Sequence, residues 1–283
     1  MARTAVQLYS LRDIDASLPD ILDLVGETPL EGVEFALRIR EDDTDVEAVL
    51  DALERNDLDV AAAHVGLEDL EENYDEMIEL YGRLGCKTLV VPWLDPEHFE
   101  SEDAVADAAE RLEAVKSDLA DDGFDLHYHN HDQEFVDLGE AAAMDELLAR
   151  ADIGFEIDLG WAQAGGVDPA EYVEKYADRI SLAHFADADG ETMECVELGA
   201  GDLDLEAVTE PSSAPMSSGT STNTTIQKIR ANRSGTVPRH SSHSGKTLDG
   251  YLASFSVVVG SGERDSVSIS NASVTVTRFW LPL

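Results

Sequence analysis

Short apolar runs alternate with amphipathic stretches along the first 209 residues of the chain. Within the stretches, apolar residues recur at helical spacing, as Leu112, Val115 and Leu119 do. The apolar runs predict strands at residues 4–9, 32–36, 58–64, 88–92, 124–129, 153–158 and 180–184. The amphipathic stretches predict helices at residues 45–55, 70–84, 102–119, 139–150 and 169–176.

This alternation, with the first four strands starting roughly 28 residues apart, indicates βα units around a parallel sheet. Seven such units fit a (β/α)8 TIM barrel better than a doubly wound sheet, and the Gly-x-Gly-x-x-Gly fingerprint is absent. We therefore predict an α/β fold, a (β/α)8 barrel that lacks a recognisable eighth βα unit. A divergent Ser/Thr-rich tail follows it.

The style of the sequence changes after Thr209. Residues 1–209 contain 56 acidic, 12 basic and 11 serine or threonine residues. The last 74 residues contain 4 acidic, 7 basic and 24 serine or threonine residues. Residues 211–222 are low in complexity, and residues 266–270 and 273–277 alternate at period two, as strands do. We therefore predict a barrel at 1–209 and an atypical tail at 210–283.

The tail is either a small β appendage or the product of a shifted reading frame. The other two frames of the coding DNA just after codon 209 distinguish these origins. A shifted frame would encode an acidic stretch with a hydrophobic strand that ends in glutamate.

The charge of the chain limits the classes of partner that it can bind. It carries 60 acidic and 19 basic residues, a formal net charge of −41. So acidic a surface argues against nucleic acid, because binding to phosphates depends on lysine and arginine. Dense carboxylates with only five lysines suit a protein that works in molar salt, where screening is effective beyond about 3 Å. We predict a halophilic protein.

Targeting and cysteine usage point to the cytoplasm. No apolar run approaches the roughly 18 residues of a membrane span, and the first residues lack the apolar stretch of a signal peptide. Cys86 and Cys195 lie far apart without metal-type spacing, which excludes a disulfide framework. The prediction is a cytoplasmic protein with no membrane or nucleic-acid partner.

Ionisable residues recur at the carboxyl ends of the predicted strands, where barrel active sites are built. Glu34 lies inside an apolar strand, His64 ends the third strand, and residues 127–135, 156–161 and 182–187 are rich in histidine or acid. Burying so many unpartnered ionisable groups is costly. A shared divalent cation removes this cost, and mixed imidazole and carboxylate ligands suit Mn²⁺, Zn²⁺, Fe²⁺ or Co²⁺.

Four segments at these strand ends carry a resemblance: residues 7–13 (QLYSLRD), 32–35 (GVEF), 128–135 (YHNHDQEF) and 158–162 (DLGWA). In their order and spacing they resemble the sugar phosphate isomerase/epimerase family of xylose isomerase-like TIM barrels. That family also contains inosose dehydratases, ketose 3-epimerases and endonuclease IV. The resemblance covers about residues 4–207.

The resemblance implies one divalent metal ion (Mn, Zn, Co, Fe or Mg), held by groups from strands five to eight. Asp158 and His184 match the ligands from strands six and seven. His129 stands at the strand-five position, with Glu134 as the alternative if the loop folds back. The strand-eight glutamate of the family has no counterpart after Thr209.

The implied activity is isomerisation or epimerisation of a sugar or sugar phosphate, by proton transfer next to a carbonyl through an ene-diolate. Glu34 and Glu134 are candidates for acid/base catalysis or for binding substrate hydroxyls, while His64 and His131 orient substrate oxygens. Taken alone, Glu34 or His64 is more often a satisfied core residue, and Glu134 is equally well a solvated loop carboxylate.

Two further side chains flank these candidates. His127 is expected to face away from His129, and Trp161 is expected to wall the pocket.

Three other functions are retained as alternatives. The first is a non-catalytic barrel that binds sugars but lacks the strand-eight glutamate. The second is an inosose dehydratase-like lyase, and the third is an endonuclease IV-like nuclease, which the missing basic groove and Trp161 in place of a histidine disfavour. If the protein acts on or binds a sugar, its partner is a small molecule. A homo-oligomer is also compatible with the sequence.

Overall fold

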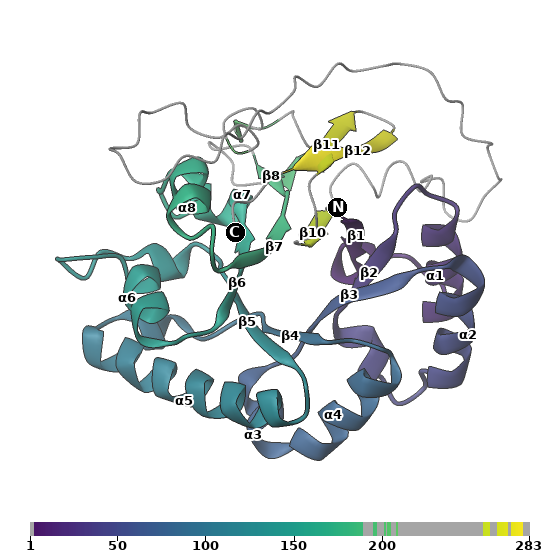
Figure 1. The fold of residues 1–283 in the computed structure, drawn as a ribbon, viewed down its shortest axis with the longest axis horizontal. Helices are drawn as coiled ribbons and strands as arrows, with labels where there is room; N and C mark the ends of the chain where they lie inside the picture. Colours follow the sequence, from purple (N-terminus) through teal and green to yellow (C-terminus); the bar gives the residue numbers. More distant parts are fainter. Residues whose placement is uncertain are drawn as a thin grey trace.

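Seven strands form a parallel sheet that curls into a barrel (Figure 1). The computed structural model describes residues 3–188, 195–196, 201, 203–204, 208, 257–260, 265–270 and 273–279. All seven predicted strands occur close to their predicted positions. They are β1 (Arg3–Gln7), β2 (Gly32–Phe35), β3 (Asp59–His64), β4 (Thr88–Val91), β5 (Asp125–His129), β6 (Gly154–Asp158) and β7 (Ile180–His184).

A strand from the tail closes the barrel. β10 (Val257–Gly260) lies between β7 and β1 and is antiparallel to both. Its pairing covers two edges that would otherwise expose backbone N–H and C=O groups. The predicted fold class is confirmed: the described residues form an α/β barrel without a parallel eighth βα unit.

The direction of β10 also decides which of its ends reaches the site. Val257 pairs with Val6, near the carboxyl end of β1, whereas Gly260 pairs with Arg3 at the amino end. The last residue of β10 therefore lies at the opposite end of the barrel from the predicted site. A glutamate at the end of a parallel eighth strand has no equivalent in β10.

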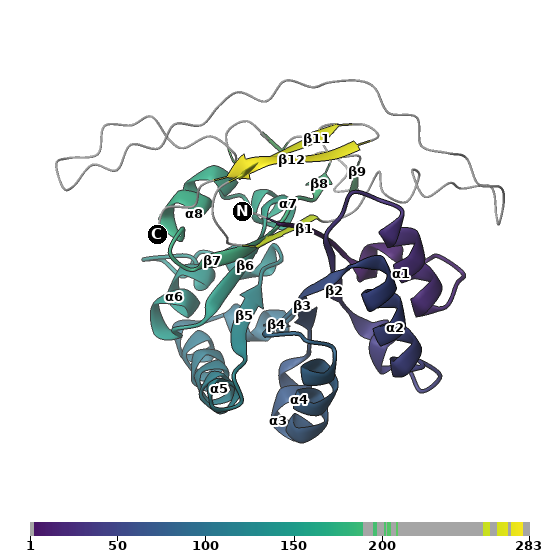
Figure 2. The same cartoon turned by 45° about the vertical axis from the view of Figure 1, so that its right-hand side comes forward.

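The helices surround the curled sheet (Figures 1 and 2). They are α1 (Leu18–Gly26), α2 (Val46–Asn56), α3 (Leu67–Glu72), α4 (Tyr74–Arg83), α5 (Glu102–Asp121), α6 (Ala143–Arg150), α7 (Leu159–Ala164) and α8 (Pro169–Lys175). No helix in the described ranges combines the length and the apolar character that crossing a bilayer requires.

The single helix predicted at residues 70–84 is wrong. The chain breaks at Asn73, whose backbone adopts φ −122° and ψ 29°, so that α3 ends before it and α4 begins after it. The Asn73 side chain donates to Asp69 Oδ1 at 3.3 Å. The backbone N–H of Asn73 still bonds the C=O of Asp69, so the break lies in the backbone angles of Asn73, and asparagine is among the weaker helix formers.

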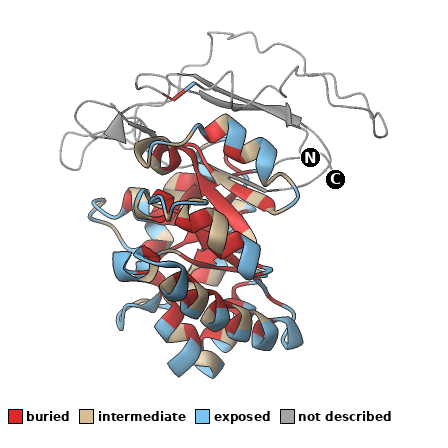
Figure 3. Cartoon of the chain, turned by 90° about the vertical axis from the view of Figure 1, so that its left-hand side faces the viewer, coloured by how far each residue is buried: buried red, intermediate tan, exposed pale blue. Residues whose placement is uncertain are grey.

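Apolar residues fill two spaces separated by the sheet. The larger core lies between strands and helices and includes Phe35, Leu112 and Phe155. Figure 3 shows it as buried residues along the strands and on the inward sides of the helices. A second, small cluster fills the barrel interior and consists of Ala5, Ala62, Val90 and Leu182. The small cluster leaves room above it, toward the carboxyl ends of the strands, for polar side chains.

Further strands come from the end of the chain and from the loop after β7. β11 (Asp265–Ser270) and β12 (Ser273–Phe279) pair antiparallel, where the period-two alternation predicts strands. β8 (Asp187–Ala188) and β9 (Cys195–Val196) form a second antiparallel pair.

The few basic side chains of the barrel form ion pairs between different helices and loops. Arg55 of α2 forms two hydrogen bonds with Asp23 of α1, both 2.7 Å long, and Arg40 pairs with Asp69. Exposed pairs of this kind contribute only about 0–1 kcal/mol each. With 12 basic residues against 56 acidic residues in positions 1–209, most of the negative charge has no positive charge to balance it.

We therefore expect stability to depend on salt. Below about 0.5 M salt the Debye length grows toward ~10 Å and the carboxylates repel one another. Circular dichroism across a KCl series should show a lower unfolding midpoint at 0.1 M than at 2 M. Equal stability at both concentrations would refute the predicted halophilic character.

Candidate metal centre

Five strands deliver ionisable side chains into the barrel above the small apolar cluster. Side chains two residues apart on a strand share a face. The register decides which residues of neighbouring strands lie side by side. His129 pairs with Glu156, and Asp158 pairs with His184. The alternation that turns Phe155 and Ile157 toward the outer core therefore turns Glu156 and Asp158 toward the interior.

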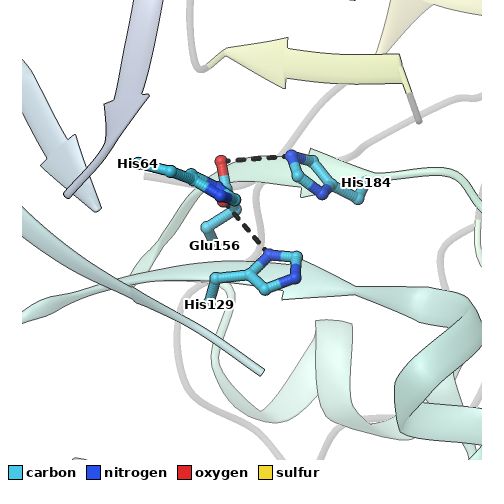
Figure 4. A group of neighbouring side chains, drawn as sticks. All are labelled: His64, His129, Glu156 and His184. Atoms are coloured by element: carbon cyan, nitrogen blue, oxygen red, sulfur yellow. Dashed lines mark hydrogen bonds and ion pairs between the residues drawn. The ribbon is translucent and has the colours of Figure 1, made fainter. Parts of the chain in front are cut away.

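A group of four residues meets there: His64, His129, Glu156 and His184, here called the His/Glu group (Figure 4). One ligand atom from each lies within 4.8 Å of all the others. Glu156 Oε2 lies 2.8 Å from His64 Nε2 and 3.2 Å from His129 Nδ1. Glu156 Oε1 lies 3.4 Å from His184 Nε2.

A second carboxylate, Glu34, adjoins the group. Its Oε2 accepts a hydrogen bond from His184 Nε2 at 2.8 Å, and its Oε1 lies 2.8 Å from His64 Nε2. Glu34 and Glu156 are both fully buried. Two buried carboxylates and three imidazoles therefore occupy one small space.

The charges of these groups shift their pKa values strongly. Burial lowers the pKa of His64, but Glu34 and Glu156 outweigh it and raise the pKa to about 9. The same two carboxylates raise the pKa of His184 above its usual range against the effect of burial. Burial opposes ionisation of Glu156, yet its histidine neighbours hold its pKa well below the ordinary value. The paired carboxylates thus require positive charge beside them.

The arrangement fits a divalent cation. Among the described residues, Oε1 of Glu34 and Oε1 of Glu156 are buried and accept no hydrogen bond. Unsatisfied buried carboxylate oxygens are costly, and a cation bound among the imidazoles would satisfy them. Mixed imidazole and carboxylate ligands suit Zn²⁺, Mn²⁺, Fe²⁺ or Co²⁺.

Asp158, predicted as a ligand, lies beside the His/Glu group. Its Oδ1 accepts a hydrogen bond from Trp161 N at 2.9 Å and caps the first turn of α7. Its Oδ2 lies 3.8 Å from His184 Nδ1. The amide of Asn130 holds this segment by bonding both the N–H and the C=O of Asp158. Asp158 therefore backs His184 on the side away from Glu34.

His131 lies between two tryptophans. Its ring centroid lies 4.8 Å from that of Trp93 and 5.3 Å from that of Trp161. Burial, followed by the nearby His129, lowers the pKa of His131 to about 3. His131 is thus a neutral imidazole, and its buried Nδ1 has no hydrogen-bond partner among the described residues.

Glu134 is fully buried and is not a solvated loop carboxylate. The short helix η4 (Gln133–Phe135) turns it back toward β5, where Tyr128 Oη donates to Oε1 at 2.7 Å and His131 N donates to Oε2 at 2.8 Å. Burial raises its pKa from 4.5 to about 7, although both hydrogen bonds act in the opposite direction. A carboxyl group of this kind exchanges protons near neutral pH.

This raised pKa predicts a pH-dependent stability. Between pH 4.5 and 7 the unfolded chain loses the Glu134 proton while the folded protein keeps it, so stability falls as pH rises through this window. Glu134→Gln should remove about 2.5 kcal/mol of that fall between pH 5 and pH 8. Urea denaturation of both proteins at pH 5 and pH 8 measures the difference, with Glu140→Gln on the exposed loop as control. Parallel pH curves for Glu134→Gln and the unmodified protein would contradict the assignment.

A cavity of about 460 Å³ opens next to the carboxyl ends of β1 and β2. Its lining includes Tyr9, Arg12, Phe35 and Arg38, which follow Gln7 and Glu34 closely in the chain. The Arg12 guanidinium lies over the Tyr9 ring at 4.2 Å.

The structure thus brings together four of the residues singled out in the sequence: Glu34, His64, His129 and His184. It places Asp158, His131 and Glu134 around them, and their roles stay predictions. Glu156 was missed. Its position two residues before Asp158 on one strand was the available signal, because it puts both side chains on the inner face.

The orientation predicted for His127 is wrong for the same reason. His127 shares the inner face with His129 and pairs with Val90 of the interior cluster. Its Nε2 contacts Ser181 Oγ at 2.5 Å. His127 lies one layer below the His/Glu group.

Comparison with known proteins shows which family the chain is similar to. The model of the xylose isomerase-like TIM barrel family matches residues 22–211. Among curated proteins, an inosose dehydratase from Geobacillus kaustophilus (strain HTA426) is 27% identical over 151 residues. This alignment covers 46% of the chain and 47% of that enzyme, so the chain spans about half the length of the curated relative it matches.

Solved structures share the fold. A sugar phosphate isomerase/epimerase from Parabacteroides distasonis ATCC 8503 superposes with a TM-score of 0.61 and 20% identity, over 72% of this chain and 84% of that one. A 3-keto-D-glucoside 4-epimerase from E. coli superposes with a TM-score of 0.51 and 16% identity, over 69% and 82%. At such identities the likeness concerns the fold alone.

Proposed function

The chain belongs to the xylose isomerase-like TIM barrel family, and from this premise we propose that it is a divalent-metal-dependent sugar isomerase or epimerase. The observation that carries the proposal is the pair of fully buried carboxylates, Glu34 and Glu156, set among three imidazoles at the carboxyl end of the barrel. A structural role alone does not explain the burial of so much charge, which is costly and is tolerated where function requires it.

Residues of the His/Glu group would hold the metal, with His129 and His184 as predicted and Glu156 in addition. A divalent cation supplies positive charge that stabilises the negative charge developing on neighbouring oxygens of an open-chain sugar. Asp158 would contribute through His184, whose Nδ1 it faces at 3.8 Å.

Glu34 is the candidate for the base that removes the proton next to the substrate carbonyl. It lies within the site, with one carboxylate oxygen bonded to His184 and the other without a hydrogen bond. Return of the proton to the other carbon gives an isomer, and return to the other face gives an epimer. Glu134, with its pKa near 7, is a second group able to exchange a proton, although it stands behind His131.

His131 and the tryptophans on either side of it would orient the sugar. The neutral ring of His131 can hydrogen-bond a substrate oxygen, and Trp93, with 44% of its surface exposed, offers an apolar face to the sugar ring. His64 is the remaining candidate for orienting a substrate oxygen. The cavity beside Tyr9 and Arg12 would take the part of the sugar or sugar phosphate away from the reacting carbons.

A lyase is the second candidate, favoured by the 27% identity to an inosose dehydratase. Dehydration of a keto sugar starts with the same proton removal, and a neighbouring hydroxyl then leaves as water. A non-catalytic sugar-binding barrel is the third candidate, because β10 brings no glutamate to the carboxyl end.

One screen separates the three functions. Sugars and sugar phosphates are incubated with the protein and Mn²⁺ in deuterated molar KCl and analysed by NMR and mass spectrometry. Isomerisation or epimerisation replaces a hydrogen next to the carbonyl by deuterium with no other change in formula, and dehydration gives loss of one water. Sugar binding without deuterium uptake across the panel would overturn the proposed activity in favour of the binding protein.

A further inference from the structure

The connections that follow the strands at the carboxyl end of the barrel are acidic. Residues 8–17, 36–45, 92–101 and 130–142 follow β1, β2, β4 and β5, and together they contain 13 acidic and three basic residues. The His/Glu group lies at this end of the barrel. A phosphate group carries about −1.5 to −2 charges and three acceptor oxygens, so the charge of these connections affects which class of sugar can bind there.

Two of the three bases already bind groups of the protein itself. Arg38 donates to the backbone C=O of Ala16 at 2.6 Å, in the connection between β1 and α1. Arg40 forms two hydrogen bonds with Asp69 of α3, of 2.5 and 2.7 Å. Two parallel bonds between a guanidinium and a carboxylate are a strong arrangement. A phosphate would have to displace these partners to use either arginine.

The third base, Arg12, shares the cavity of about 460 Å³ with several carboxylates. A cavity of this volume can hold a small molecule. The guanidinium of Arg12 lies over the Tyr9 ring and donates to the Tyr9 C=O at 2.9 Å. The charged residues of the cavity lining are Arg12, Arg38, Asp13, Asp15 and Glu41. Three carboxylates against two arginines give the lining a net negative charge.

The helix N-termini at this end are occupied as well. A helix N-terminus is otherwise a ready site for phosphate, and α1, α2 and α5 begin here. Their capping side chains, Ser17, Asp45 and Ser101, each accept a hydrogen bond from a backbone N–H of the first turn. Each first turn also contains at least one carboxylate. An anion at any of these three termini would replace a cap and lie beside a negative charge.

An uncharged sugar suits these surroundings. A carboxylate can only accept hydrogen bonds, and a sugar hydroxyl can donate one. A phosphate dianion is itself an acceptor, so the carboxylates cannot bind it, and an unpaired charge is costly. We infer that the substrate is an uncharged sugar and not a sugar phosphate, and that Asp13, Asp15 and Glu41 bind its hydroxyls away from the reacting carbons. The inference rests on the proposed function and names its substrate class.

A matched pair of substrates tests the inference. The sugar skeleton that is most active or most tightly bound in the screen is taken as the free sugar and as its phosphate monoester at the carbon farthest from the carbonyl. D-Fructose and D-fructose 6-phosphate are one such pair. Deuterium uptake and calorimetric binding are measured with the full chain in molar KCl at equal free Mn²⁺. The free sugar should be favoured at least about tenfold in kcat/KM and in Kd.

A variant locates the discrimination in the cavity. Asp13→Asn/Asp15→Asn/Glu41→Gln keeps acceptors for hydroxyls but removes three charges, so the preference for the free sugar should fall at least about fivefold. The control Asp42→Asn/Asp43→Asn/Glu97→Gln removes three charges at exposed positions outside the cavity lining. In molar salt, where charges are screened beyond about 3 Å, it should change the preference less than about twofold.

The outcomes separate this inference from the proposed function. Deuterium uptake from the phosphate at an equal or higher kcat/KM would overturn the inference and leave the isomerase intact. Selective binding of the free sugar without deuterium uptake would support the inference and refute the isomerase. An unchanged preference in the cavity variant would also overturn the inference, because the carboxylates of the lining would then not select the substrate.

Discussion

Addition of saturating Zn²⁺ or Mn²⁺ is expected to raise the melting temperature of the protein by about 5–10 °C. A cation that binds only the native state at 100 times its Kd adds about 2.7 kcal/mol of stability. For a domain of this size each kcal/mol corresponds to about 2–4 °C. The physical source of the gain is relief of the buried, unsatisfied oxygens of Glu34 and Glu156.

His184→Ala and Glu156→Gln should each abolish this shift, and Asp158→Asn should weaken or abolish it. His98→Ala, at a histidine on η3 (Pro96–Phe99) outside the His/Glu group, serves as control and should keep the full shift. Differential scanning fluorimetry at fixed high salt measures all five proteins. An undiminished shift in both His184→Ala and Glu156→Gln would end the metal assignment.

Replacement of Glu34 by glutamine is expected to lower the rate of substrate proton exchange by about 10²–10⁴-fold, the usual contribution of a positioned general base. Gln can still accept the hydrogen bond from His184 Nε2, but it cannot take a proton. The change should therefore leave the fold intact while removing the chemistry. Deuterium uptake by the best substrate of the screen, measured under single-turnover conditions, gives the rate.

Glu31→Gln is the matched control for this variant. Glu31 directly precedes β2, is exposed, and lies at the amino end of the strand that carries Glu34 near its carboxyl end. It should exchange protons at the unmodified rate. If Glu34→Gln retained full exchange, the base would have to be sought elsewhere, with Glu134 as the next candidate.

Hydrophobic periodicity predicted the seven parallel strands because most of them are short runs buried on both faces, as β2 and β4 are. It also predicted where Glu34, His64, His129 and His184 would meet, since parallel strands present their carboxyl ends at one end of a barrel. α1 was not among the predicted helices, although its sequence carries the signals of one. Ser17 caps its first turn, Pro19 follows, and four apolar residues recur at helical spacing.

Other features depend on contacts that a sequence pattern does not encode. The break at Asn73 is a change of backbone angles at one residue within an otherwise periodic stretch. The contact between the Gln7 amide and His64 Nδ1 joins residues that are 57 positions apart in the chain. The pairing of β10 with β1 joins segments whose alternation alone specifies neither partner nor direction.

That pairing has a consequence for how the protein folds. Contacts between β1 and β2 join residues about 28 apart, whereas β1 and β10 join the first strand to residues 257–260. Closing so long a loop costs more chain entropy, and non-local pairing slows folding. The βα units should therefore form first as an open, curled sheet, and closure should be the last event. During synthesis, the edges of β1 and β7 would stay open until Gly260 has left the ribosome. In that interval a nascent barrel is most exposed to pairing with the sheet edge of another copy.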